Sequence, residues 1–445
     1  MKKNHITAAV CLAAALAVTV VTGLNFASLK DLGEIKPGDG VTGTKMLSEY
    51  FDGIKGSSMD TEVYILEGEK PGGKVLILGG THGNEPAGYL AAITFIENAK
   101  VEEGTVYVIP YTNRSGMTHN DPQEASPQYL NITTPSGVRK FRYGSRASNP
   151  VDQWPDPDVY VHAASGQQLS GSETRNINRA YPGRPDGNPT EQAAYAIAEL
   201  IRAEDINETF DLHEASPEYP VINATVSHEK GMSLAAAGMM ELTLGGIQMS
   251  LEPSPVNLHG LTHRELGDYT DTIPLLMETA NASQGRLRGA TNEALALTGK
   301  DKAYVKSAKL GFLYVPYDEN GHPIEERVGR HLQGVIEYTN AYNQLYPDKP
   351  VVFSGVPTYT ELFLSSDGTD LGGTRLGLSL IHICAKDAIQ KVKEYAERGY
   401  IHAVALDLSK YFDTLNLSLI HIYPLLVSSR SCHVPSRQTQ AVASL

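Results

Sequence analysis

Short apolar runs recur along the chain, and they predict the strands of one sheet. The clearest runs occupy residues 63–66, 75–78, 106–109, 210–212 and 275–277. Apolar runs of this length, bounded by turn residues, are typical of buried strands. The stretches between several of them carry apolar residues at helical spacing. Strands that alternate with helices indicate an α/β fold with a mixed, largely parallel central sheet.

Three helices are predicted from their start signals and their periodicity. The clearest covers residues 190–203, where Asn188 can cap the N-terminus and Pro189 takes the first helical position. Its apolar side chains share one face. A second helix is expected over residues 86–98, and a third, which closes the domain, over residues 326–346. These elements place one domain at about residues 46–346.

A polar stretch interrupts this domain. Residues 118–168 are rich in Pro, Asn and Ser and include Trp154, the only tryptophan. Loops of this length inside a compact domain are usually functional or disordered. We expect this one to form a wall of a cleft. After the domain, residues 359–377 are poorly patterned, and residues 347–377 are interpreted as a truncated C-terminal segment.

The N-terminus combines two lysines with a long apolar run. Lys2 and Lys3 precede residues 6–24, which are rich in Ala and Val. This is the pattern of an export signal, and the run is also near the length that spans a bilayer. We therefore expect residues 1–27 to be a signal peptide or a membrane anchor. The protein is predicted to be extracytoplasmic, and to contact a membrane only through this segment.

Composition narrows the class of protein. The chain has 445 residues, of which 41% are hydrophobic and 20% charged, as in globular proteins. Its net charge of -14 argues against nucleic-acid binding, which needs a basic surface. The three cysteines, Cys11, Cys384 and Cys432, leave none in residues 24–377. The predicted domain therefore has neither a disulfide nor a thiolate for a metal.

Metal-ligand residues follow two of the predicted strands. The run at 75–78 is followed by Gly79-Gly80-Thr81-His82-Gly83-Asn84-Glu85. The run at 210–212 is followed directly by His213. Catalytic zinc takes three ligands from His and carboxylate side chains and keeps a fourth position open. Open α/β sheets place their sites where strands end. We expect His82, Glu85 and His213 to hold one Zn²⁺ per chain, with glycines allowing the tight turn.

Two further segments add proton-transfer and anion-binding groups. The run at 275–277 is followed by Glu278, a carboxylate that could take a proton from an attacking water and pass it to a leaving amine. The other segment, residues 173–183, contains Arg175 and Arg179. Arginine suits the binding of a carboxylate through two parallel hydrogen bonds.

Four motifs within residues 75–285 resemble those of the aspartoacylase and succinylglutamate desuccinylase family, a branch of the zinc carboxypeptidase superfamily. The motifs are His82-Gly-Asn-Glu85, Asn176-Ile-Asn178-Arg179, Asp211-Leu-His213 and Glu278. The resemblance implies a zinc carboxypeptidase-like α/β/α sandwich. It implies that the zinc ligands are His82, Glu85 and His213. It also implies that Glu278 acts as general base and acid, and that Asn178 and Arg179 contact the substrate carboxylate.

The resemblance leaves some positions open. Asn113 falls where the family often has a pocket asparagine, and Asn176 stands where an Asp is usual. Arg264 is a further candidate contact for an anion, with a solvated surface arginine as the alternative, and Arg175 either binds substrate or braces its loop. The arginine that stabilises the oxyanion is one of four candidates: Arg175, Arg146, Arg142 and Arg114.

These features predict a zinc-dependent amidohydrolase that cleaves an N-acyl amino acid. Two alternatives come from the same residues: an exported carboxypeptidase that acts on peptides or cell-wall peptides, and a non-catalytic binding module. Because a binding module has no need of Glu278 beside three metal ligands, the hydrolase is preferred. The expected partner is a small N-acyl amino acid or peptide substrate.

The C-terminal tail follows a different pattern. The hexamer at residues 378–383 recurs identically at 417–422. Between the copies, residues 385–416 resemble a fragment of a group II intron reverse transcriptase, with Asp407 at the first catalytic aspartate. The chain has no Tyr-x-Asp-Asp motif, and polymerase chemistry needs carboxylates from both segments. We interpret residues 378–445 as a chimeric tail and expect no polymerase activity.

Overall fold

A nine-stranded mixed sheet forms the centre of the protein in a computed structural model that describes residues 2–121, 126–134 and 137–363. All of these residues belong to the first of two units, Met1–Ile381 and His382–Leu445. The strands of the sheet are β1 (Gly43–Met46), β2 (Glu62–Glu67), β3 (Lys70–Leu78), β4 (Lys100–Ile109), β9 (Glu208–Ala215), β10 (Ala224–Ser227), β11 (Ser250–Pro253), β12 (Ile273–Ala280) and β13 (Val352–Ser354).

The strand order brings together runs that are distant in the sequence. The order is β1-β2-β4-β3-β9-β12-β10-β11, and β13 pairs with β4. The four central strands β4, β3, β9 and β12 are parallel, whereas β1, β2, β13 and the β10–β12 pair are antiparallel. The prediction of a mixed sheet with a parallel centre is confirmed. All five predicted strands lie within this sheet, and the carboxyl ends of the four parallel strands β4, β3, β9 and β12 meet at one edge.

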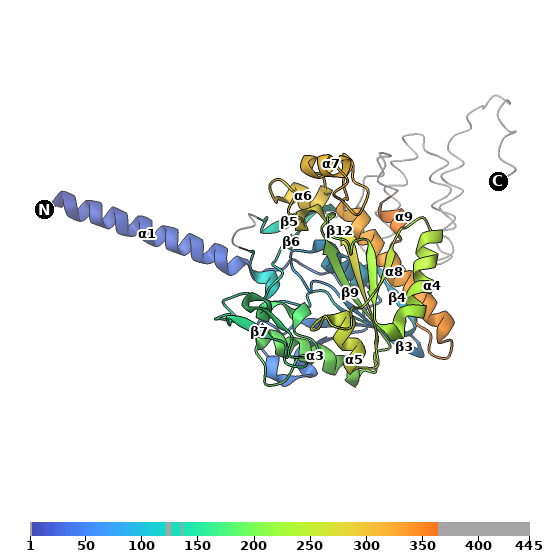
Figure 1. Cartoon of the computed structure of the whole chain (residues 1–445). Helices are drawn as coiled ribbons and strands as arrows, with labels where there is room; N and C mark the ends of the chain where they lie inside the picture. Colours follow the sequence, from blue (N-terminus) through green and yellow to red (C-terminus); the bar gives the residue numbers. More distant parts are fainter. Residues whose placement is uncertain (1, 122–125, 135–136, 364–445) are drawn as a thin grey trace, which may run out of the picture. The chain divides into compact units, whose positions relative to one another are not determined.

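Helices cover both faces of the sheet, as Figure 1 shows. One face packs against α2, α4 and α8, and the other against α3. Each face of the sheet has its own hydrophobic core, and successive side chains of a strand point to opposite faces. In β3, Val75 and Ile77 belong to one core, and Leu76 and Leu78 belong to the other. The helices are α1 (Lys2–Ser28), α2 (Pro86–Asn98), α3 (Pro189–Ala203), α4 (Met232–Leu244), α5 (Gly267–Tyr269), α6 (Glu293–Thr298), α7 (Lys302–Lys309), α8 (Ile324–Leu345) and α9 (Tyr359–Leu362).

The three predicted helices are confirmed as α3, α2 and α8. Asn188 caps α3, since its side chain accepts a hydrogen bond from the Glu191 N–H at 3.0 Å, and the Glu191 carboxylate accepts one from the Asn188 N–H at 3.0 Å. Pro189 takes the first position of the helix. This reciprocal pair satisfies two backbone donors, and a cap of this kind is worth about 1 kcal/mol.

The polar stretch at residues 118–168 is not one structureless loop. It contains the hairpin of β5 (Tyr129–Thr134) and β6 (Gly137–Arg142), and the strand β7 (Val159–Val161), which pairs with β8 (Gln168–Ser170). Alternate side chains of β5 are buried, and the polar residues Asn131 and Thr133 between them face outward. The expectation of a loop was wrong here because half-exposed strands have a polar composition.

The N-terminal helix α1 is long and apolar. Residues 4–28 are long and apolar enough to cross a membrane, and their side chains are exposed along the helix. The chain that follows it enters the core directly, because Leu32 is buried there and the Leu32 carbonyl accepts from the Arg142 N–H. A single apolar helix near the N-terminus fits both a signal sequence and an anchor.

The C-terminal predictions fall mostly beyond the described part of the chain. Val356 and Leu362 pack into the same core as the sheet, and Thr358 caps α9. The repeated hexamers and the reverse-transcriptase-like fragment at residues 385–416 lie outside the described residues, as do residues 364–377.

Candidate active site

The loop after β3 turns sharply and delivers two side chains to the edge of the sheet. Gly80 has a φ of +63°, a conformation that L side chains rarely adopt, and a Cβ there would lie 2.8 Å from the Pro110 carbonyl oxygen. His82 follows in this turn, and Glu85 is the residue that precedes α2. The position of α2 is fixed by close packing, since a Cβ on Gly88 would lie 2.2 Å from the Leu212 carbonyl oxygen.

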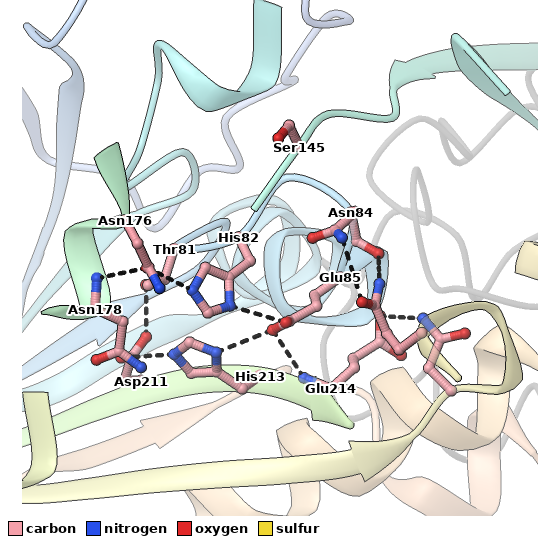
Figure 2. Close-up of polar contacts among 12 residues, drawn as sticks. Thr81, His82, Asn84, Glu85, Ser145, Asn176, Asn178, Asp211, His213 and Glu214 are labelled. Carbon is pink, nitrogen blue, oxygen red and sulfur yellow. Dashed lines mark hydrogen bonds and ion pairs between the residues drawn. The ribbon is translucent and has the colours of Figure 1, made fainter. Parts of the chain in front are cut away.

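His213 comes from the neighbouring strand β9 and completes a cluster with His82 and Glu85. Figure 2 shows the two imidazoles on either side of the Glu85 carboxylate. Nδ1 of His82 lies 2.8 Å from Oε1 of Glu85, and Nδ1 of His213 lies 2.9 Å from Oε2. All three side chains are buried, and one potential ligand atom from each lies within 4.8 Å of the others. The chain thus brings the three predicted metal ligands together.

Each imidazole is oriented by a partner on its far nitrogen. Nε2 of His213 donates to Oδ2 of Asp211 at 2.8 Å, and Nε2 of His82 donates to Oδ1 of Asn176 at 3.0 Å. These bonds leave both Nδ1 atoms directed at Glu85. Metal-binding histidines in proteins are commonly held in this way, and two imidazoles with one carboxylate are a donor set of open catalytic zinc sites. The residues therefore fit a zinc ion.

Asp211 is itself fixed from two sides. Its Oδ1 accepts from the Thr81 hydroxyl and its Oδ2 from the Thr262 hydroxyl, both at 2.6 Å. Burial raises the pKa of Asp211, but the His213 ring and these hydroxyls outweigh it, so the pKa is lowered. Asp211 is therefore a charged acceptor behind His213, whereas His82 has a neutral amide.

The electrostatics of the cluster follow from burial and close charges. Burial lowers the pKa of His82. Burial also disfavours the charged form of His213, but Asp211 and Glu85 outweigh it and raise its pKa well above the ordinary value. For Glu85, burial is outweighed by the two imidazoles, and the pKa is lowered. Glu85 is thus an ionised carboxylate, the form in which it can bind a cation.

Glu278 lies beside this cluster on β12. Its Cα is paired in register with that of His213 on β9, so both side chains point to the same face of the sheet. Its Oε2 atom is buried and has no hydrogen-bond partner among the described residues. Burial raises the pKa of Glu278, Glu85 and Asp211 add to the rise, and His213 and Arg146 oppose it. A buried carboxylate oxygen without a partner is rare in proteins and is a feature of functional sites.

Two arginines carry positive charge close to the site. Arg179 is 3.8 Å from Glu173, and its NH1 donates to the Asn178 carbonyl at 2.6 Å. Arg146 is half-buried, and its charge acts on the pKa values of His82, Glu173, Arg179 and Glu278. Within the described ranges, no hydrogen bond or ion pair engages the Arg146 guanidinium. Of the four oxyanion candidates, Arg146 thus has its charge beside the cluster and its donors available.

Other predicted arginines have different partners. Arg175 forms a bidentate pair with Asp156, at 2.7 and 2.9 Å, and donates to the Ser148 carbonyl, so it braces its loop. The Arg142 guanidinium donates to backbone carbonyls and to Asn120. Arg264 was expected either to bind an anion or to be solvated, but it is buried against Ser254, Glu229 and Asp268. The described residues thus use its donors within the fold.

The predicted asparagines differ in their hydrogen-bond partners, and of the three only Asn176 bonds to a residue of the cluster. Oδ1 of Asn178 accepts from the Thr262 N–H at 3.0 Å, which ties its loop to that of Thr262. Asn176, the departure from the family pattern, accepts from both His82 and the Asn178 N–H. Oδ1 of Asn113 accepts from the Gly116 N–H and the Ser148 hydroxyl, and its buried Nδ2 has no partner in the described part of the chain.

One residue of the site was not predicted. Glu214 follows His213 on β9, and its Oε2 accepts from the Ala87 N–H at 2.8 Å, while Arg327 on α8 pairs with its Oε1. This contact fixes the first turn of α2, and with it Glu85. The signal in the sequence was a second carboxylate directly after a ligand histidine, but its role depends on the helix that packs over it.

Comparison with known proteins gives matches to solved structures only. No protein-family model matches the chain, and no curated protein matches it. The tripeptide-bound cell shape determinant Csd4 from Helicobacter pylori is 14% identical, with a TM-score of 0.39, over 69% of this chain and 61% of that one. The chain thus spans about three fifths of the length of Csd4.

Two further matches have names that the motifs anticipated. A succinylglutamate desuccinylase/aspartoacylase from Rhodobacter sphaeroides is 16% identical, with a TM-score of 0.30, over 49% of this chain and 51% of that one. An aspartoacylase family protein from Mesorhizobium loti is 18% identical, with a TM-score of 0.31, over 55% and 62%. The chain is similar to members of this family. At this level of similarity, the function has to be inferred from the side chains of the site.

Proposed function

We propose that the protein is a zinc-dependent hydrolase that cleaves the amide bond of an N-acyl amino acid. The observation that carries the proposal is the buried, unpartnered Oε2 of Glu278 on the strand beside the His82, Glu85 and His213 cluster. A metal site alone would fit a structural role. A carboxylate without a partner next to three ligands fits proton transfer.

His82, Glu85 and His213 would hold the zinc ion, with Asp211 and Asn176 orienting the two imidazoles. When bound, zinc supplies a Lewis acid that polarises a carbonyl and makes water a better nucleophile near neutral pH. No cysteine binds this ion, because Cys11, in the N-terminal helix, is the only cysteine among the described residues.

Glu278 performs the proton transfers in this mechanism. It accepts a proton from the attacking water and delivers it to the nitrogen that leaves. Its raised pKa helps it to hold that proton between the two steps. The neighbouring groups Glu85 and Asp211 contribute to this by disfavouring a further negative charge.

Arg146 and Arg179 divide the binding of negative charge. The Arg146 guanidinium, with free donors in the described structure, stabilises the oxygen that becomes negative as the carbonyl is attacked. Arg179, beside Asn178, binds the carboxylate of the amino acid that is released. Arg175 is assigned to bracing of the loop through Asp156, not to the substrate.

The test uses the full-length chain supplied with zinc and a panel of N-acyl amino acids beside free and C-terminally blocked peptides. Release of amine from N-acyl amino acids alone supports the proposal, whereas trimming of free peptides would make the protein a carboxypeptidase. Glu278→Gln should lower kcat by at least about a hundredfold and retain one zinc per chain.

Glu241→Gln is the matched control, because Glu241 is exposed on α4. It should keep both zinc and the wild-type rate. A Glu278→Gln variant with near-normal turnover would refute the role of Glu278, even if the zinc content is unchanged.

A further inference from the structure

The segment around α6 and α7 has a charge opposite to that of the chain. Residues 286–310 contain six Lys and Arg and two Asp and Glu, a net charge of +4, whereas the whole chain carries -14. Positive charge is therefore concentrated in a segment that takes no part in the site described above. A local excess of this kind indicates attraction to an anionic surface.

The helix α7 turns its lysines outward. Lys302, Lys306 and Lys309 recur at helical spacing and are all exposed, whereas Tyr304 between them is fully buried against Tyr317. Within the described chain, none of the three ammonium groups is in an ion pair. The lysines are thus available to a partner, and the buried side of the helix fixes their direction.

Large apolar side chains continue this surface past the end of α7. Leu310 is 58% exposed, Phe312 59% and Tyr314 64%. Singly exposed apolar residues are common on proteins, but here three alternate positions directly follow the row of lysines. Aromatic and aliphatic side chains beside lysines are typical of segments that insert into the interface of a bilayer.

A series of contacts joins this surface to the end of the N-terminal apolar helix. The Tyr129 hydroxyl on β5 donates to the carbonyl of Ser28, the last residue of α1, at 2.7 Å. Nδ2 of Asn131, on the same strand, donates to Glu293 at 3.0 Å, and Glu293 is the first residue of α6. The α6 helix then packs against α7 through Leu295 and Tyr304. Figure 1 shows α6 and α7 beside the β5–β6 hairpin.

We propose that Lys302, Lys306, Lys309, Leu310 and Phe312, the α7 face, dock on an anionic lipid surface. The lysines bind the headgroups and the two apolar side chains enter the interface. The membrane is the occupant because the face is basic and because β5 and α6 connect its helix to the end of α1, the helix that can cross a bilayer. The proposal is independent of the hydrolase activity, and it gives the membrane a second contact besides α1.

The test is hydrogen exchange of residues 302–314 in the full chain reconstituted into vesicles. Vesicles of phosphatidylcholine alone are compared with vesicles that also contain phosphatidylglycerol. We expect slower exchange of this segment only with phosphatidylglycerol, and loss of the effect at high salt, which screens the lysines. Each lysine near an anionic surface changes binding by about fivefold, so replacing all three should weaken docking by about a hundredfold.

The variant for this test is the triple change Lys302→Gln, Lys306→Gln and Lys309→Gln. Its control carries Lys55→Gln, Lys70→Gln and Lys100→Gln, which removes equal charge from exposed sites elsewhere. Because α1 is intact in the triple variant and in its control, both proteins stay with the vesicles. Only the Lys302, Lys306 and Lys309 variant should lose the slower exchange of residues 302–314 on vesicles with phosphatidylglycerol. Phe312→Ser should weaken it as well.

Two results would overturn the proposal. One is equal exchange of residues 302–314 on vesicles with and without phosphatidylglycerol. The other is protection that grows with protein concentration and ignores lipid composition, since it would assign the α7 face to a second copy of the chain.

Discussion

The two histidines of the cluster differ in the residue that orients them. His213 donates to the carboxylate of Asp211, whereas His82 donates to the amide of Asn176. A carboxylate that accepts a hydrogen bond from one imidazole nitrogen makes the other nitrogen a stronger ligand for a metal. An amide in the same position has a weaker effect, because it carries no net charge. Nδ2 of Asn176 is in turn fixed by Glu173 at 2.7 Å. His213 should therefore contribute more to metal affinity than His82.

Asp211→Asn tests this difference. The shape is kept and the charge is removed, so zinc affinity should fall by about 10- to 100-fold. Competition with a chelating dye measures the dissociation constant directly. Glu241→Gln serves again as the control, and an unchanged dissociation constant in Asp211→Asn would show that the Asp211 charge does not support the metal.

At this scale, the sequence predicts short side chains at strand ends better than long ones. His82, Glu85 and His213 meet because each lies within a few residues of a strand that enters the same edge of the sheet. The direction of an arginine depends on its tertiary neighbours. Arg264 could therefore be expected on the surface, although Glu229 and Ser254 hold it inside the protein.

The start of β9 carries an acidic side chain in an apolar setting. Glu208 is fully buried beneath α8, its Oε1 has no partner among the described residues, and the Thr339 hydroxyl lies 3.4 Å from its Oε2. Burial raises the pKa of Glu208 to about 8. The folded protein therefore keeps this carboxyl protonated at pH values where the unfolded chain has lost the proton.

The stability of the protein should consequently depend on pH through Glu208. Its contribution is fully present below the ordinary glutamate pKa and is lost as the pH rises to about 8. At pH values above 8, Glu208→Gln should therefore raise the free energy of unfolding by on the order of 5 kcal/mol more than the same substitution does at pH 4. Urea unfolding at both pH values measures the change, and a variant with the wild-type pH slope would contradict it.

Among the elements, the buried ones were predictable and the half-exposed ones were not. The runs at 75–78 and 210–212 are buried on both faces, so they stand out as continuous apolar segments. In β5 only alternate residues, Leu130, Ile132 and Thr134, are buried. That period of two was present in the sequence, but the surrounding Pro, Asn and Ser residues obscured it.

For the molecule as a whole, the cluster of His82, Glu85 and His213 links distant parts of the chain. It joins the start of α2 to β9, and Glu214 extends the same network to α8 through Arg327. An ion that binds only the folded protein adds to its stability, by about 4 kcal/mol at a thousand times its dissociation constant. Zinc should therefore stabilise the central sheet and both of these helices together.

Removal of zinc tests this linkage. A chelator should lower the melting temperature by on the order of 10 °C, and zinc should restore it. His213→Ala, which lacks one ligand, should show no response to either, as measured by calorimetry. An equal shift in His213→Ala would mean that the ion binds elsewhere.

The short connection between α1 and the core has a consequence for encounter with substrate. Only three residues lie between Ser28, the last residue of α1, and Leu32, which is buried in the core, and the four Cα–Cα steps between them reach about 14 Å at most. If α1 is retained as an anchor in a bilayer, the edge that carries His82, Glu85 and His213 stays at the lipid surface. The search of the proposed hydrolase for substrate would then be two-dimensional, and its turnover would be set by the density of substrate at that surface.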